Sequence, residues 1–186
     1  TLTTSSAASD VYKRQAKMRE LRVNSDIAVA VSGGPDSLAL MHLSNRYALN
    51  NNINLTVLSI DHGIRAESSK EIVWLEKIAK KNKINFYSTK LKKKINSSNT
   101  LSKARTLRYE ALSKYCNKKK IKFLLTAHHL DDEIENFLMR LIRGSGVKGL
   151  SSLKVKSRYK NTKLILVRPL LELSLIHISE PTRPYW

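Results

Sequence analysis

The sequence has few acidic residues, little cysteine and no long apolar run, and the last two shortages each exclude a class of protein. Its single cysteine, Cys116, can form no disulfide within the chain and cannot build a thiolate metal site by itself. No apolar run is long enough to cross a bilayer, so we expect no membrane contact. These shortages favour a cytoplasmic protein over the disulfide-rich secreted and membrane-spanning classes.

Basic residues outnumber acidic ones in this sequence. Lysine and arginine number 34 against 15 aspartates and glutamates, which gives a formal net charge of +19. This balance favours a polyanionic partner such as a nucleic acid. The many lysine, asparagine and isoleucine residues also fit the codon usage of an AT-rich genome, so both explanations of the charge stay open.

Both ends of the chain match translations of transposase sequencing adapters. Ser5–Gln15 reads SSAASDVYKRQ and Leu173–Arg183 reads LSLIHISEPTR, and each string equals an in-frame adapter translation without a mismatch. We therefore treat residues 1–15 and 173–186 as adapter-derived tails and exclude them from the fold argument. The native segment is expected to be residues 16–172, truncated at both ends and long enough for one domain.

The stretch DIAVAVSGGPDS, residues 26–37, is typical of a buried strand, a glycine-bearing turn and the start of a helix. Backbone N–H groups at such a turn, together with the helix dipole, attract an anion. Glycine allows positive φ and close approach of the backbone to a phosphate. We interpret the stretch as a phosphate-binding loop, with an ordinary strand–turn–helix corner as the alternative.

The loop belongs to neither of two common nucleotide-binding motifs. A Walker A loop requires a Gly-Lys pair, and none occurs anywhere in the chain. The dinucleotide fingerprint requires a third glycine, which this loop lacks. What remains is the string SGGPDS at Ser32–Ser37.

The rest of the chain alternates between strand and helix patterns. Strands are expected at 26–31, 53–60, 84–87, 121–126 and 164–167, and helices at 38–49, 70–82, 101–117 and 130–142. This alternation predicts an α/β fold with a parallel sheet and helices on both faces. Ligands bind such sheets at the carboxyl ends of the strands. Four polar features are expected there: Ser32–Ser37, Asp61–Gly63, Tyr87–Ser88 and Ala127–His129.

An arginine interrupts the apolar stripe of the helix expected at 101–117. The stripe consists of Leu101, Ala104, Arg108, Ala111 and Tyr115. A core-facing Arg108 needs a partner because an unpaired buried charge is costly. Arg105 lies one turn earlier. These arginines either meet phosphate, ribose or RNA, or form a structural salt bridge, for example with Glu110.

Polar residues crowd the start of the helix expected at 130–142, in the string AHHLDDEIE. Carboxylates in a first turn suit the helix dipole, so capping explains one or two of them. His128, His129 and the acidic residues also suggest a metal site. Zinc is not expected, because these groups need not converge and no cysteine joins them, whereas Mg²⁺ held jointly by a carboxylate and phosphates is favoured. A pocket for a cationic amino-acid side chain stays open.

The apolar stripe of this helix is Leu130, Ile134, Leu138 and Leu141. The basic segment that follows, residues 140–149 with Arg140 and Arg143, either contacts RNA phosphate or is a flexible connection.

Taken together, these motifs resemble the tRNA(Ile)-lysidine synthases of the PP-loop ATPase superfamily. The loop resembles the pyrophosphate loop SGGxDS of that superfamily. The matching strings are AVSGGPDS at Ala30–Ser37, DHGIR at Asp61–Arg65, KARTLRYEAL at Lys103–Leu112, LTAHHLDDEIENFLMRLIRGSG at Leu125–Gly146 and RPLLE at Arg168–Glu172. The long block at Leu125–Gly146 is far more specific than the loop alone.

The resemblance implies a Rossmann-like sheet of the adenine nucleotide alpha hydrolase type and an ATP-dependent ligase. Such enzymes attach free L-lysine to C2 of the wobble cytidine of tRNA(Ile) with a CAU anticodon, through an adenylated cytidine. ATP and Mg²⁺ are the implied cofactors, with Asp36 a candidate for the metal or the reacting phosphate. Because family members continue into tRNA-binding domains, we expect this chain to bind ATP but to form little or no lysidine.

The resemblance also assigns site residues. The implied ATP-binding residues are Ser32, Gly33, Gly34, Pro35, Asp36 and Ser37, the implied catalytic residues are Asp36, Arg108, His128 and Asp132, and the implied tRNA-binding residues are Arg105, Arg140 and Arg143. Asn136 is a mild departure, since the family usually has threonine there. Two other functions remain as alternatives: a tRNA-thiolating PP-loop enzyme, which commonly uses cysteine pairs, and a non-catalytic nucleotide- or RNA-binding module.

Overall fold

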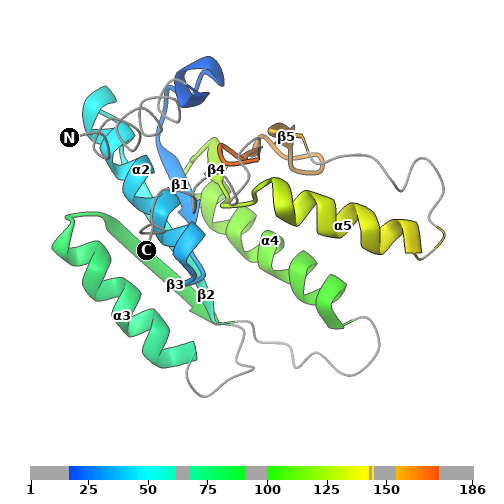
Figure 1. Cartoon of the computed structure of the whole chain (residues 1–186). Coiled ribbons are helices and arrows are strands. Elements are labelled where there is room, and N and C mark those ends of the chain that lie inside the picture. Colours follow the sequence, from blue (N-terminus) through cyan, green and yellow to red (C-terminus); the bar gives the residue numbers. More distant parts are fainter. Residues whose placement is uncertain (1–16, 62–67, 91–99, 143, 145–153, 172–186) are drawn as a thin grey trace, which may run out of the picture.

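The computed structural model describes residues 17–61, 68–90, 100–142, 144 and 154–171, and every structural statement below concerns these residues (Figure 1). Helices flank a six-stranded sheet. The strands are β1 (Ile27–Ala30), β2 (Leu55–Asp61), β3 (Asn85–Lys90), β4 (Phe123–Leu125), β5 (Lys156–Arg158) and β6 (Ile165–Val167). The helices are α2 (Pro35–Asn51), α3 (Ser68–Lys81), α4 (Thr100–Lys118) and α5 (Leu130–Ile142).

The strand order is β3-β2-β1-β4-β6-β5. All neighbours pair in parallel except β5, which runs antiparallel to β6. The predicted parallel α/β sheet is therefore confirmed, and β5 is an additional strand at its edge. Sequence patterns missed β5 because its residues, KSR, carry no apolar alternation and remain largely exposed.

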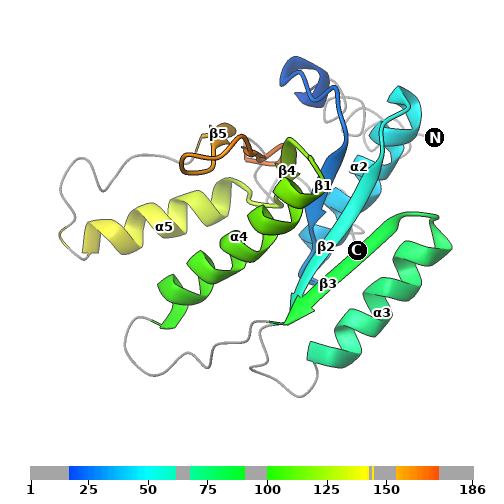
Figure 2. The same cartoon turned by 180° about the vertical axis from the view of Figure 1, so that it is seen from behind.

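Helices cover both faces of the sheet, as predicted (Figures 1 and 2). Alternate residues of β1 point to opposite faces, since side chains of a strand alternate. On one face, α2 and α3 enclose a core that includes Val29, Leu40, Met41, Val57, Leu75 and Ala79. On the other face, α4 encloses a core that includes Ala28, Leu58, Tyr109, Leu112, Cys116 and Leu124.

Helix α2 begins earlier than predicted. It begins at Pro35 rather than at residue 38, since proline is well suited to a first helical turn. It ends at Asn51 and is followed by the C-cap Asn52, whose φ of 53° is left-handed and whose N–H donates to the Ala48 carbonyl. One side of α2 packs against the sheet, whereas Leu49 is 71% exposed.

Helix α4 presents a different stripe to the core from the one predicted. Tyr109, Leu112 and Cys116 are buried against the sheet, whereas Ala104, Arg108, Ala111 and Tyr115 are only partly buried. The helix thus carries two adjacent apolar stripes, and periodicity alone could not choose between them. This rotation moves Arg108 from the predicted core position to the side of the helix.

Strand β3 extends further than predicted, to Lys90. The expectation that Tyr87 and Ser88 lie at the carboxyl end of the strand was therefore wrong, since the strand continues past them. As an outer strand of this sheet, β3 has mostly exposed side chains, and their polarity hid its true length.

Helix α5 extends away from the sheet beside α4 (Figures 1 and 2). Its sequence is amphipathic, yet Ile134 and Leu138 of the predicted apolar stripe are each 48% exposed. Sequence periodicity identified the helix correctly but could not show whether another element covers its apolar face. No helix in the described part of the chain has the length and apolar character needed to span a membrane.

Cys116 should be chemically inert in the native chain. Its side chain is fully buried, and burial raises the pKa of the thiol from 9.0 to about 12. We expect a thiol-specific reagent at about pH 8 to label native chain at least roughly a hundredfold more slowly than urea-unfolded chain. The measurement is a stopped-flow labelling rate with and without urea. Cys116→Ser should abolish labelling, and comparable rates in the two states would refute the prediction.

Because the native thiol keeps its proton to higher pH than the unfolded one, the contribution of Cys116 to stability is complete below pH 9 and falls as the pH rises toward 12.

Candidate nucleotide-binding site

The turn between β1 and α2 is held open by its own hydrogen bonds. Gly33 has a φ of +92°, a region that side chains with a Cβ rarely adopt. The Ser37 hydroxyl donates to the Gly34 carbonyl at 2.8 Å, and the Ser32 amide donates to Ser37 Oγ at 3.3 Å. One buried serine therefore connects both sides of the loop and fixes its shape before any ligand binds.

The loop opens directly onto the N-terminus of α2. Gly34 is the N-cap and has no side chain with which to cap the first turn. The amides of Asp36 and Ser37 lie in that turn, where the helix dipole adds positive potential. The arrangement has the features of an anion-binding loop, as the sequence predicted.

The loop lies where the sheet changes direction. From β1 the chain proceeds outward through β2 and β3 on one side, and β4 and β6 lie on the other side. Connections at such a switch point leave in opposite directions and open a crevice at the carboxyl ends of the strands. A pocket of about 240 Å³ occupies this position.

The pocket has an apolar wall and a polar wall. The apolar wall comes from β1, β2 and α4 and includes Ala30, Leu58, Ile60 and Leu112. The polar wall comes from the loop after β1, through Ser32, Gly34, Asp36 and Ser37, and from residues 126–129 after β4. A ligand with a flat apolar part and an anionic part matches both walls.

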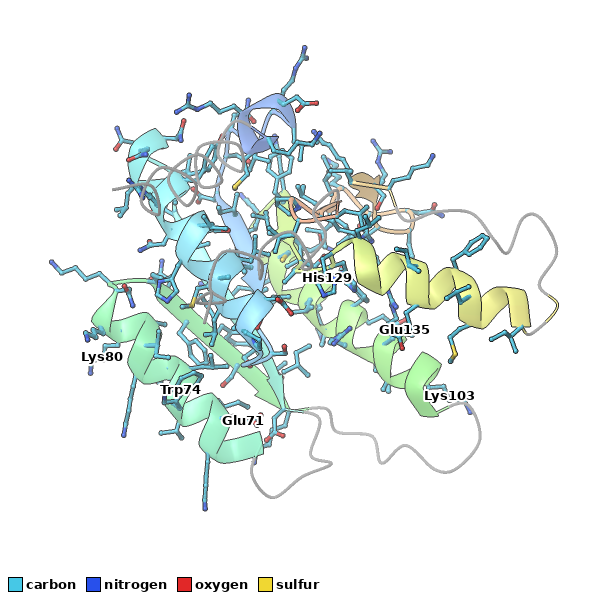
Figure 3. All side chains as sticks on the ribbon, viewed as in Figure 1. Glu71, Trp74, Lys80, Lys103, His129 and Glu135 are labelled. Carbon is cyan, nitrogen blue, oxygen red and sulfur yellow. The ribbon has the colours of Figure 1, made fainter. Side chains whose placement is uncertain are left out.

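His129 bridges the two polar segments of the pocket. Its Nε2 lies 3.8 Å from Asp36 Oδ2, within ion-pair distance when the imidazole is protonated. Figure 3 shows His129 where α5 begins. The two residues are far apart in the sequence, and the parallel pairing of β1 with β4 brings their segments together.

His128 is held by the strand that precedes it. Its Nδ1 lies 3.0 Å from the Oγ1 of Thr126, which is only 4% exposed. The Thr126 amide donates to the Val167 carbonyl at 3.0 Å, so the backbone at this point is anchored to β6. Both His128 and Thr126 line the pocket.

Arg108 brings a positive charge to the α4 side of the pocket. Its guanidinium carbon lies 5.7 Å from the centre of the Tyr109 ring, within the range of a cation–π contact. Glu110, the suggested structural partner of Arg108, instead pairs with Lys160, whose Nζ lies 2.9 Å from Glu110 Oε1. The placement in the pocket therefore favours contact with an anionic ligand over a structural salt bridge to Glu110.

Several predicted site residues are not among the described residues that line this pocket. Arg105 lies on α4 one turn before Arg108 but does not line the pocket as described. Asp132 and Arg140 lie in α5, and their side chains are outside the described residues, as are Arg143 and residues 62–63 in full. Their predicted roles stay predictions.

The structure also places in the pocket residues that had not been assigned to the nucleotide site. Leu58 and Ile60 lay in a predicted strand and Leu112 in a predicted helix, without a role in a site. Thr126 ended a predicted strand, and His129 had been suggested only for a metal site, whereas His128 had also been assigned a catalytic role. The signal that could have identified Thr126 and His129 was the cluster of polar residues at the end of the strand predicted at 121–126.

An uncapped, glycine-bearing loop at the switch point of a parallel sheet defines an α/β nucleotide-binding protein. A family model described as a PP-loop domain matches residues 6–183. The chain belongs to this PP-loop family.

Curated relatives are named tRNA(Ile)-lysidine synthase. The chain is 48% identical over 149 residues to that of Rickettsia bellii (strain OSU 85-389), covering 80% of this chain and 34% of the relative. It is 42% identical over 160 residues to that of Wolbachia pipientis wMel, covering 84% of this chain and 36% of the relative. The chain thus spans about a third of the length of these relatives.

The fold is also similar to a solved structure, the U34-tRNA thiolase NcsA from Methanococcus maripaludis with its 4Fe–4S cluster. The TM-score is 0.73 at 24% sequence identity, and the similarity covers 90% of this chain and 61% of that one. At this identity the similarity shows the fold alone.

Gly33→Ala should distort the loop through its backbone rather than through a clash. A Cβ at Gly33 would meet nothing within 4 Å, but a φ of +92° is strained for alanine by about 1–2 kcal/mol. We expect a matching loss of stability in urea unfolding, or a several-fold weaker affinity for ATP in calorimetry if the loop relaxes instead.

Gly34→Ala is the matched control. Gly34 has a φ of −70°, and its added Cβ would come no closer than 3.8 Å to Ser32 Oγ. Its losses should be smaller, and equal losses in the two variants would argue against a role for the positive φ.

Proposed function

We propose that this chain is the ATP-binding, adenylating part of a tRNA(Ile)-lysidine synthase. The observation that carries the proposal is the pocket in which the SGGPDS loop, Arg108 and His128 lie together. The names of the relatives support the substrate, and the PP-loop family supports the nucleotide. Adenylation needs positioning and charge stabilisation more than covalent chemistry, and this pocket supplies donors and a cation.

The proposed reaction has two steps. The O2 oxygen of the wobble cytidine in a CAU anticodon bonds to the α-phosphorus of ATP, and the bond to pyrophosphate breaks. An amino group of free lysine then bonds to C2, and AMP leaves with the oxygen. The loop residues Ser32, Gly33, Gly34, Pro35 and Ser37 would surround the pyrophosphate, and the apolar wall would receive the adenine.

Asp36 would hold Mg²⁺ together with the ATP phosphates. In the described part of the chain, no group of three or more His, Cys, Asp or Glu side chains could hold a metal ion. One carboxylate beside a phosphate loop nevertheless fits Mg²⁺, which commonly uses one or two carboxylates plus substrate phosphates. When bound, the ion would neutralise charge on the phosphates.

The remaining assigned residues would serve the other two substrates. Asp132 is proposed to hold the lysine ammonium, and Arg105, Arg140 and Arg143 to contact tRNA phosphate. The net charge of +19 supports an RNA partner. A thiolating enzyme is less well supported, because the single cysteine of this chain is fully buried and is a poor ligand for a cluster.

Asp36→Asn tests the proposal in the longer protein. It removes a negative charge beside the loop while keeping the size of the side chain. We expect pyrophosphate release that depends on both lysine and the cognate tRNA to fall roughly a hundredfold or more. Binding of tRNA, measured by filter retention, should change less than about twofold, because the change removes no cation.

Glu76→Gln is the control, since Glu76 is an exposed carboxylate on α3. It should leave both measurements unchanged. If the wild-type protein releases no pyrophosphate with lysine and tRNA yet binds both ATP and RNA, it is a non-catalytic module instead. For the 186-residue chain alone we expect ATP binding with little or no lysidine formation.

We also propose that residues 1–15 and 173–186 are adapter-derived and that the native part is residues 16–172. The residue-for-residue adapter matches at both ends support this. Resequencing the source locus should replace both strings with other codons. Finding the same codons in genomic DNA running through position 173 would refute it.

A further inference from the structure

Helix α3 carries a row of exposed lysines with a tryptophan among them. Lys70, Trp74, Lys77 and Lys81 are spaced so that the three lysines lie within about 60° of Trp74 around the helix axis. All four side chains are exposed, and Trp74 is 47% exposed. Figure 3 shows Trp74 midway along α3. These four residues are called the Lys–Trp stripe below.

The Lys–Trp stripe faces away from the sheet. Leu75 and Ala79, on the opposite side of α3, are buried in the core. The two glutamates of the helix, Glu71 and Glu76, lie on either side of the stripe and outside it. The stripe is therefore a surface of one charge sign, about 16 Å long at 1.5 Å per residue.

The stability of the helix does not explain these lysines. Lys81 suits the dipole at the last turn, but Lys70 lies in the first turn, where a positive charge is unfavourable. Within the described part of the chain, none of the three lysines of the stripe forms a salt bridge. Their charges are therefore available to an anionic partner.

An RNA strand fits this surface better than a protein or a membrane does. Lysine is depleted in protein–protein interfaces. A helix that lies on a membrane inserts its apolar face, and the apolar face of α3 is already buried against the sheet. Proteins that bind single-stranded nucleic acid combine cations for the phosphates with aromatic rings on which bases stack. The Lys–Trp stripe holds both kinds of group.

The stripe begins at the edge of the sheet where the pocket opens. Helix α3 follows the carboxyl end of β2 and returns the chain to β3, which runs parallel to β2. Lys70 therefore lies toward the edge that holds the pocket, and Lys81 toward the opposite edge. An RNA strand whose reacting base enters the pocket can continue over this edge and along α3.

We propose that the Lys–Trp stripe is an RNA-binding surface on which the lysines contact phosphates and Trp74 stacks against an unpaired base. Taking tRNA as this RNA rests on the proposed function. The surface lies outside the reaction pocket and is separate from the arginines proposed above to contact tRNA.

Binding of an unmodified tRNA(Ile) transcript with a CAU anticodon to the 186-residue chain tests the lysines. Neither ATP nor lysine is added. Replacing Lys70, Lys77 and Lys81 together by glutamine should weaken binding about tenfold at low salt. The slope of log K against log salt concentration should become shallower by about 2, because three phosphate contacts to a single strand are lost.

Lys118, Lys119 and Lys120 supply the matched control. They are exposed at and just after the end of α4, which covers the other face of the sheet. Their replacement by glutamine removes the same charge and should weaken binding less than about twofold. Equal losses in the two triple variants would show attraction by net charge alone and would overturn the proposal.

The fluorescence of Trp74 tests base stacking. The chain has two tryptophans, so Trp186→Phe leaves Trp74 as the one emitting indole. The transcript should quench this emission, and a fully paired RNA duplex should quench it far less. Trp74→Leu should weaken binding of the transcript roughly fivefold or more without changing the salt slope, whereas Trp74→Phe, which retains a ring, should lose less.

A chain that does not bind the transcript, or an indole emission that the transcript does not quench, would overturn the proposal. Wild-type affinity in Trp74→Leu would overturn it as well. If Trp74→Leu does not fold, the quenching measurement still decides. Because these measurements need no pyrophosphate release, their failure is distinguishable from failure of the Asp36→Asn test of the proposed reaction.

Discussion

The parallel pairing of β1 with both β2 and β4 is the constraint on which the site depends. Because β1 lies between them, the loop that follows it opens at the point where the sheet changes direction. The same pairing places residues 126–129 beside the loop and brings His129 to Asp36. If β1 paired differently, the loop would keep its local shape but lose the second wall of its pocket.

The loop is ordered from within, and its neighbours are ordered by the sheet. Ser37 connects Ser32 to Gly34, so the turn needs no ligand to hold it. His128 is oriented instead by Thr126, whose backbone is anchored to β6. A pocket built from pre-oriented groups loses little entropy when a ligand binds.

Much of the fold and part of the site could be predicted because their signals are local. The strand, turn and helix at residues 26–37 follow from residue order alone, and the structure confirms the parallel sheet with helices on both faces. Arg108 stood out as the charged residue in a predicted apolar stripe, but its predicted position facing the core was wrong. The helix rotates so that Tyr109 faces the core, which leaves Arg108 at the pocket.

The sequence by itself determined most of the elements, their alternation and the chemistry of the loop, because these depend on neighbours within a few residues. Only the tertiary structure decided which side of α4 is buried, that the apolar face of α5 is partly exposed, and which histidine faces Asp36. Those outcomes depend on packing between segments distant in the chain. Periodicity shows that a helix has an apolar face, but only the packed neighbours determine what that face meets.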